Sequence, residues 1–409
     1  MKKDLLSTGL ARIIAIAASI IQGIIVARFL LEEGKGVISL YAVALNLTLS
    51  LGDLGGKQSY AYAMSKKGWT AAETLPYVWR SYGSALLIEL VLLLTVLWSQ
   101  ELMHREHIVV ALLALMAVRL YNSYSYSYAL ARRNIKLINL CNVLDQVLAL
   151  VVMAWFIAYR GRGEVWYFVG MLVGAGSVGV LLTNWRRNLL TTETHIRRES
   201  FDWGKWKMIT LKGLTYAIPL FVLGLNYRLD VFIVDHFWGV ATVAIYSQGA
   251  SLAQMLWLLP EVMNLVIFSY SLNTIRERSF ANALLDNLSR MMKVMGLLLI
   301  PIGVIAYYLI PIIYGTGFAQ SSDVFVIILP GVFLMILFKS LNGDLAARGY
   351  PMIAAYVFTP AVALNVMLNF LLIPSYGAIG AAWASTISYS LASVTYYSIY
   401  RRMTDKLTD

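Results

Sequence analysis

Charged residues are scarce in this chain. Asp, Glu, Lys and Arg make up 13% of its 409 residues, whereas about 25% is usual in a soluble domain. This scarcity excludes an ordinary soluble protein. Hydrophobic residues make up 59% of the chain and form repeated runs of about 20 residues, the length that one crossing of a lipid bilayer needs. Twelve such runs can be placed, so the sequence predicts an all-α, polytopic membrane protein with about twelve transmembrane helices.

Cysteine and histidine are also rare, and the chain lacks the motifs of soluble enzymes. The single cysteine, Cys141, cannot form an intrachain disulfide and is expected to be a small buried apolar residue. The four histidines do not have the spacing of metal ligands, and neither a nucleophile elbow nor a phosphate-binding loop occurs. No outer loop is long enough to house a catalytic domain. The sequence therefore predicts a protein that is not an enzyme and that holds no metal or organic cofactor.

Positive charge exceeds negative charge, with 33 Lys and Arg against 22 Asp and Glu and a net charge of +11. Most of the basic residues fall in loops on one side of the predicted helices, and cytoplasmic loops are the ones that carry Lys and Arg. This pattern places both chain termini in the cytoplasm. The excess of Lys and Arg is therefore explained by membrane topology and by attraction to anionic lipid headgroups. Nucleic acid is not an expected partner.

The longest connection between the predicted helices divides them six and six. It runs from Trp185 to about Lys212 and carries two Arg-Arg pairs. We therefore expect an N-terminal six-helix lobe over residues 1–185, a basic cytoplasmic linker over 186–211 and a C-terminal six-helix lobe over 212–409. The composition of the linker is compatible both with an interfacial helix and with a solvated segment.

Two stretches of the first predicted lobe resemble stretches of the second. Gly34–Tyr41 matches Gly239–Tyr246, and Ala149–Phe156 matches Ala363–Phe370. Both matches pair a helix of the first lobe with the corresponding helix of the second in the same direction, as in the parallel repeats of transporters. We therefore predict that a pseudo-two-fold axis along the membrane normal relates the lobes, with a transport path between them.

Basic residues interrupt several apolar runs, where an unpaired charge is costly. Such residues usually face a watery cavity or an opposite charge, so they are candidates for binding an anion. The candidate substrate-binding residues are Arg12, Arg119, Arg228 and Lys339, with Lys57 as a secondary candidate. An Arg guanidinium in particular matches two phosphate oxygens at once. Arg80 begins a predicted helix at its inner end and is expected to be an interfacial anchor.

Structural roles for the same cations are left open. Arg12 could instead extend its head group to the membrane interface, and Arg228 could form an ion pair with another helix. Arg119 and Lys339 could each pair with a buried carboxylate, for which the candidates are Glu89, Asp145 and Asp344.

Carboxylates in the apolar runs are candidates for coupling ion movement to transport. Burial lets a carboxylate switch between charged and neutral forms, and it can bind a proton or Na⁺. The candidate coupling or gating residues are Asp53, Glu89, Asp145, Asp230 and Glu261, with an ordinary salt bridge as the alternative for each. Asp53 and Lys57 are four positions apart, the spacing at which an acid and a base meet on one helix face, so a structural or gating pair is expected.

Four tyrosines gather in Tyr121–Tyr128, near the inner end of a predicted helix. Tyrosines at this depth commonly form an aromatic belt at the membrane interface. Stacking of their rings on a sugar is the alternative.

Three stretches carry a recognisable pattern: Leu51–Gly55; Pro219 through Arg228-Leu229-Asp230 with the following Ile245-Tyr246-Ser247; and Leu364-Asn365 with Leu368-Asn369 and Leu372–Ala382. Their order and spacing within a twelve-helix frame resemble Wzx-type O-antigen flippases. These proteins form part of the polysaccharide-transporter branch of the multidrug/oligosaccharidyl-lipid/polysaccharide (MOP) exporter superfamily. The likeness extends over nearly the whole chain.

The resemblance implies two lobes that work by alternating access. It implies that undecaprenyl-diphosphate-linked oligosaccharide, an O-antigen or related surface polysaccharide repeat unit, moves from the cytoplasmic to the periplasmic leaflet of the bacterial inner membrane. A proton or sodium gradient is the expected source of energy. The expected partners are this lipid-linked substrate, the membrane lipids, and a polysaccharide polymerase with its chain-length regulator.

Two other functions are weighed against this one. A drug or cation antiporter of the same superfamily should favour an acidic, aromatic cavity, whereas the charged residues deep in this chain are strongly basic. A membrane enzyme of glycan assembly is the third alternative, and it would be expected to carry acidic or Arg-rich sites in large outer loops.

Overall fold

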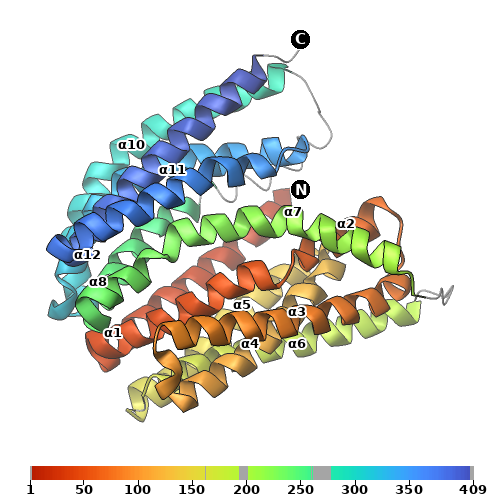
Figure 1. Ribbon diagram of the computed structural model, residues 1–409, viewed down its shortest axis with the longest axis horizontal. Helices are drawn as coiled ribbons and strands as arrows, with labels where there is room; N and C mark the ends of the chain where they lie inside the picture. Colours follow the sequence, from red (N-terminus) through yellow and green to blue (C-terminus); the bar gives the residue numbers. More distant parts are fainter. Residues whose placement is uncertain (1, 162, 193–200, 259, 261–277, 406–409) are drawn as a thin grey trace. The chain divides into compact units, whose positions relative to one another are not determined.

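A computed structural model of the chain describes residues 2–161, 163–192, 201–258, 260 and 278–405. Within these residues the secondary structure is helical, and no β-strand occurs (Figure 1). The long helices are α1 (Lys2–Gly52), α2 (Gly56–Lys66), α3 (Ala71–Ser99), α4 (Glu106–Ala131), α5 (Ile135–Met153), α6 (Val165–Thr192), α7 (Trp203–Arg228), α8 (Asp230–Gln254), α10 (Arg278–Tyr314), α11 (Gln320–Ala347) and α12 (Met352–Thr404). Short helical segments are η1 (Leu102–His104), η2 (Ala154–Tyr159), η3 (Met255–Trp257) and η4 (Thr316–Phe318).

Nine segments of the described residues are long and apolar enough to cross a membrane. Three of them have 58, 55 and 53 residues, more than twice the ~20 that one crossing needs. Each of the three contains a break with non-helical backbone angles, at Leu31, Gly239 and Gly377 respectively. Dividing the three segments at these breaks gives twelve apolar helical segments within the described chain. The prediction of an all-α, multi-pass membrane protein is therefore confirmed.

The breaks coincide with the internal sequence matches. Gly239, where φ is 76°, begins the stretch matched in the second half, and Leu31, where φ is 56°, lies just before the equivalent Gly34. A left-handed backbone suits glycine and strains leucine by about 1–3 kcal/mol. A helix break at both positions agrees with the predicted pairing of these two parts of the chain.

The chain divides into two compact units, Met1–Phe221 (unit 1) and Val222–Asp409 (unit 2). The boundary lies inside α7, beyond the linker predicted over 186–211, and both ends of that linker belong to helices α6 and α7. The first part of α7 belongs to unit 1 because its side chains pack there: the Trp206 indole Nε1–H donates to Ser81 Oγ at 2.9 Å. Pro219 removes one backbone donor from α7 just before the boundary, which favours a bend at this point.

In unit 1, α4 and α5 both pack against α6, and α1 packs against α5 and α3. In unit 2, α8, α11 and α12 pack against one another and α10 covers α11. Small residues permit these contacts: Gly249 of α8 lies against Val324 of α11, and Gly331 of α11 lies against the backbone of Thr386 on α12. Close helix contacts through glycine are typical of membrane proteins, in which helices must pack without a hydrophobic driving force.

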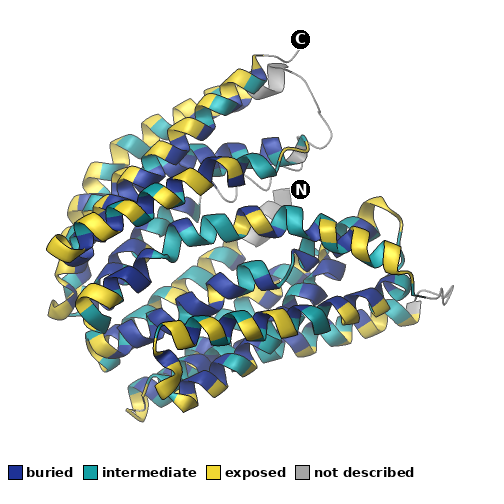
Figure 2. Cartoon of the chain, viewed as in Figure 1, coloured by how far each residue is buried: buried dark blue, intermediate teal, exposed yellow. Residues whose placement is uncertain are grey.

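Exposed positions recur along α10, whereas α11 is mostly buried (Figure 2). The exposed side chains of α10 are apolar, as at Leu297 and Ile300, which are 79% and 75% exposed. A large apolar surface is unfavourable in water and favourable against lipid tails. This face of α10 is therefore a lipid-facing surface.

Candidate functional site

The run Leu51–Gly55 forms a sharp turn between α1 and α2, here termed the α1–α2 joint (residues 52–56). Leu54 and Gly55 have left-handed backbones, with φ of 53° and 65°. The Asp53 carboxylate holds the turn, because its Oδ1 accepts the Gly55 N–H at 2.7 Å and its Oδ2 accepts the Ser123 hydroxyl of α4 at 2.8 Å. Asp53 therefore binds α4 to the end of α1.

Asp53 and Lys57 do not form the predicted direct ion pair, although their charges interact at longer range. The prediction assumed a continuous helix, but the left-handed turn at Leu54 and Gly55 changes the direction of the chain between the two side chains. The Lys57 ammonium instead lies over the Tyr126 ring, 5.1 Å from its centroid. Asp53 has a structural role at the joint, and Lys57 is held by a cation–π contact.

Glu89 of α3 is fully buried against the same joint. Its Oε1 is 2.6 Å from the Thr48 hydroxyl of α1. Its carboxylate also lies directly against Gly52, where a Cβ would collide with Oε2. Among the described residues no donor reaches Oε2. Glu89 therefore combines full burial with an oxygen that has no donor among the described residues.

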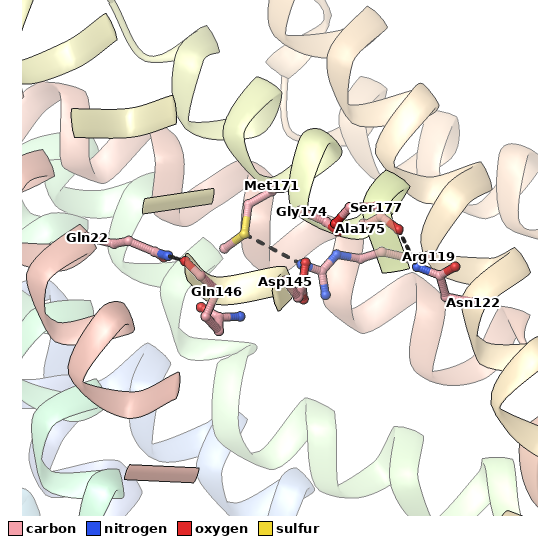
Figure 3. Close-up of polar contacts among 9 residues, drawn as sticks. All are labelled: Gln22, Arg119, Asn122, Asp145, Gln146, Met171, Gly174, Ala175 and Ser177. Atoms are coloured by element: carbon pink, nitrogen blue, oxygen red, sulfur yellow. Dashed lines mark hydrogen bonds and ion pairs between the residues drawn. The ribbon is translucent and has the colours of Figure 1, made fainter. Parts of the chain in front are cut away.

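Arg119 of α4 pairs with Asp145 of α5, and Figure 3 shows the two side chains meeting beside α6. Arg119 Nη2 is 3.6 Å from Asp145 Oδ2 and 3.6 Å from the sulfur of Met171. Asp145 also packs against Gly174, where a Cβ would contact its backbone and its Oδ1. Of the two alternatives left open for Arg119, the structure favours the ion pair with Asp145.

Asp230 lies at the start of α8 in unit 2 and is fully buried. Its Oδ2 accepts hydrogen bonds from the Tyr246 hydroxyl and from the Ser385 hydroxyl, the latter at 2.9 Å. Its Oδ1 has no donor among the described residues. A buried carboxylate with one oxygen free of donors is suited to bind a cation or a proton.

Two buried amides, those of Asn365 and Asn369, lie in the first half of α12. Helix α12 is broken at Gly377, and Gly380 beyond the break lies against the Leu372 carbonyl before it. A helix rises about 1.5 Å per residue. Counted from this contact along the two halves of α12, Asn369 and Asn365 lie at about the same depth as Ser385. Asn369 Nδ2 donates to Asn365 Oδ1 at 2.9 Å, and Asn369 Oδ1 has no donor among the described residues. Asn365 and Asn369 thus form a second buried polar pair in unit 2, at about the depth of the Asp230 carboxylate.

Lys339 of α11 is half-buried beside aromatic rings in unit 2. Its ammonium lies 4.4 Å from the centroid of the Trp257 ring and 5.4 Å from that of Tyr227. The Trp257 indole is itself fixed, because its Nε1–H donates to the Val332 carbonyl at 2.8 Å. The carboxylate of Asp344, predicted as one option to pair with Lys339, contacts Arg348 at 2.8 Å. Aromatic faces thus hold the lysine in place within a membrane-spanning helix.

The other predicted residues occupy varied positions. Arg12 is half-buried on α1, and Arg228 is half-buried at the last turn of α7 in unit 2. Arg80 is exposed on α3, and its guanidinium lies 3.6 Å from the centroid of the Phe201 ring, as suits an anchor near an interface. Glu261 lies outside the described residues.

Arg186, which the sequence places in the linker, is instead a buried cation of α6. The residue lies on α6, is only 7% exposed, and donates from Nη2 to the Tyr121 hydroxyl at 3.0 Å. Its guanidinium also lies near the rings of Trp79 and Tyr128. The apolar pair Leu189-Leu190 after the arginines was the available signal that α6 continues.

The tyrosines of Tyr121–Tyr128 therefore pack inside unit 1. Tyr124 and Tyr128 are buried in its aromatic core, and Tyr121 contacts Arg186. Burial of the two core tyrosines is incompatible with stacking on a sugar in this conformation, and it differs from the lipid exposure of an aromatic belt.

Solved structures with a similar fold include transporters of the MOP superfamily. A Vibrio cholerae MATE transporter in the bent form superposes with a TM-score of 0.68 at 12% identity, covering 98% of this chain and 97% of that structure. The lipid II flippase MurJ in an inward closed conformation gives a TM-score of 0.68 at 13% identity, covering 100% and 94%. At such low identity the likeness establishes the fold alone.

Sequence comparison identifies the family. The probable flippase AglR of Haloferax volcanii is 28% identical over 252 residues, which are 58% of this chain and 49% of that protein. The chain thus matches about half the length of this curated relative. The family of polysaccharide biosynthesis proteins matches residues 1–270, which is more than half of the chain. With this match, and with the twelve apolar helical segments already described, the chain belongs to the polysaccharide biosynthesis protein family of membrane proteins.

Proposed function

We propose that the protein is a flippase for a lipid-linked oligosaccharide. The observation that carries the proposal is the presence of half-buried cations within the membrane helices of a chain of this family, above all Lys339. The substrate that we assign is an undecaprenyl-diphosphate-linked repeat unit of O-antigen or a related surface polysaccharide. It moves from the cytoplasmic to the periplasmic leaflet of the bacterial inner membrane by alternating access, and both termini of the chain are cytoplasmic.

The chemistry of the cargo supports this assignment. A diphosphate that leaves water loses strong hydration, and a cation in the protein offsets part of that loss. The lipid tail needs no such help, because it can remain in the hydrocarbon. Binding must also be modest so that the cargo can leave. The charge of Arg119 is already balanced by Asp145, which makes this residue a weaker ligand candidate.

The proposal is tested by reconstituting the purified protein in proteoliposomes with fluorescently labelled lipid-linked oligosaccharide. Arrival of the label in the opposite leaflet should be faster than in empty vesicles, with the glycan structure unchanged. Drug efflux without flipping would favour the antiporter alternative. A chemically altered glycan would favour the membrane enzyme. Absence of acceleration across several glycans would contradict the proposal, and adding the polysaccharide polymerase and its chain-length regulator would then test whether flipping needs these partners.

We infer that flipping is coupled to a cation gradient, of protons or sodium, through the cluster around Asp230. The inference rests on one fully buried carboxylate oxygen without a donor and on amide and hydroxyl oxygens on α12 at about the same depth. Oxygen ligands of this kind suit Na⁺, and the carboxylate alone suits a proton.

Asp230→Asn should remove the response to the gradient while leaving the fold intact. The amide retains the size of the side chain and can still accept hydrogen bonds from Tyr246 and Ser385. Flipping driven by an imposed proton or sodium gradient should fall by at least about tenfold, with slow flipping in the absence of a gradient preserved. The matched control is Asp323→Asn, at the first turn of α11, which should respond like the wild type. An undiminished gradient response in Asp230→Asn would contradict the inference.

A further inference from the structure

The surroundings of Glu89 do not suit an ionised carboxylate. The side chain is 0% exposed between α1 and α3, and Oε2 faces Gly52 without a donor among the described residues. An ionised oxygen buried without hydrogen bonds is far more costly than a neutral acid in the same place. The geometry of the carboxyl group thus favours the neutral form.

Hydrogen counting at Thr48 leads to the same conclusion. The Thr48 Oγ1 is 2.6 Å from Glu89 Oε1 and 3.0 Å from the Ala44 carbonyl. Both oxygens are acceptors when Glu89 is ionised, but a threonine hydroxyl has a single hydrogen to donate. When Glu89 carries a proton, it donates to Thr48 Oγ1, and Thr48 donates in turn to Ala44. One added proton therefore satisfies both short contacts.

The neighbouring charged groups provide no counter-ion. Asp53 at the α1–α2 joint is itself a carboxylate, held by Gly55 and Ser123, so its charge opposes a second negative charge nearby. Lys57 of α2 lies over Tyr126. Arg119 of α4 is paired with Asp145. Among the described residues no Lys or Arg pairs with Glu89, and the Lys57 charge acts on Asp53.

We propose that Glu89 is a proton-binding site that controls the conformation of the α1–α2 joint. The neutral acid packs against Gly52 and bridges to Thr48, which holds α3 against the end of α1. When the O–H bond breaks and the proton passes to water, the resulting carboxylate needs donors that this packing does not provide. The joint then has to open to admit water, and its left-handed residues Leu54 and Gly55 are the positions at which the backbone turns. This site is separate from the Asp230 cluster and does not depend on the identity of the cargo.

The protonation state is tested on the full-length protein in lipid by infrared spectroscopy. Wild-type protein at neutral pH should show the carbonyl stretching band of a buried, protonated carboxylic acid, and the band should disappear as the pH is raised. The same band should be missing from Glu89→Gln and retained in Asp230→Asn, which controls for a second fully buried carboxylate that has an oxygen without a donor among the described residues. Identical spectra for wild type and Glu89→Gln would overturn the proposal.

The effect on the joint is tested by the reactivity of an introduced thiol. In a Cys141→Ala background, Ser50→Cys places a thiol on α1 just before the joint, at a half-buried position. Its rate of reaction with a water-soluble maleimide should rise several-fold at high pH after correction for the reactivity of a free thiol. Adding Glu89→Gln, a permanently neutral mimic of similar shape, should abolish the rise. A rise that persists in Glu89→Gln would show that Glu89 does not control the joint.

Failure of this proposal and failure of the flippase assignment can be told apart. Both measurements use the protein without cargo. A Glu89 band together with absent flipping would support the proton site and reject the transport assignment. Normal flipping without a Glu89 band would support the transport assignment and reject the proton site.

Discussion

Replacing Lys339 by methionine should slow flipping of lipid-linked oligosaccharide by at least about tenfold, the equivalent of ~1.4 kcal/mol in the barrier. The ammonium lies within a membrane-spanning helix, where a charge is retained at a cost and a diphosphate would benefit from it most. Methionine keeps the unbranched stem and can pack against Trp257 and Tyr227, so the fold should persist. Initial flipping rates in proteoliposomes, at matched amounts of folded protein, provide the measurement.

Arg80→Met is the matched control for this experiment. Arg80 also lies over an aromatic ring, that of Phe201, but it is exposed on α3. Loss of its charge should leave the flipping rate within about twofold of the wild type, because an exposed cation is already hydrated. An equal reduction of the flipping rate in the two variants would mean that depth in the membrane does not decide which cations bind the substrate.

Gly213→Ala should destabilise the protein by about 1–3 kcal/mol, although alanine is the better helix former. Gly213 lies on α7 where the helix crosses the α1–α2 joint, and a Cβ there would collide with the Leu54 carbonyl. Gly55 on the other side of the crossing likewise lies against the backbone of Gly213. Neither backbone can move aside without breaking the crossing. Thermal unfolding in detergent, followed by tryptophan fluorescence, should show a lower midpoint and reduced flipping.

Gly83→Ala separates packing from helix propensity. Gly83 is also a helix-interior glycine, on α3, but nothing lies within 4 Å of the position its Cβ would take. Alanine there should leave stability unchanged or raise it by up to about 1 kcal/mol. If both substitutions changed the stability in the same direction, the close approach of the two backbones would not explain the glycine at position 213.

Much of the fold could be predicted from local properties of the sequence. Long apolar runs require helices in a bilayer, because backbone donors and acceptors have no water to bond to. Length therefore fixed the number of helical segments, and the short matches around Gly34 and Gly239 indicated the repeat. The domain boundary was harder to predict. It lies at Phe221 because the first part of α7 packs against unit 1, and no local feature of residues 186–211 reports that contact.

The candidate site was predicted less completely, because pairing is a property of three dimensions. The spacing of Asp53 and Lys57 indicated a pair that the left-handed turn at Leu54 prevents. Arg119 and Asp145 lie on different helices, so their contact could be proposed as one option among several but not selected. Asn365 and Asn369 could be recognised in the sequence only as part of a family motif, and the structure adds that both are buried and bonded to each other.

The amino-acid sequence by itself determined that this protein is a multi-pass helical membrane protein with an unusual number of cations and carboxylates in its apolar segments. Composition and hydrophobic length suffice for that conclusion, since they set the free energy of each segment in lipid or water. Only the tertiary structure decided which of those charges are balanced and which are not. Arg119 is neutralised by a neighbouring helix, Lys339 is held by aromatic faces, and Glu89 and Asp230 each retain an oxygen without a donor among the described residues. The physical reason is that the energy of a buried charge depends on partners brought within a few ångströms by packing, whatever their distance along the chain.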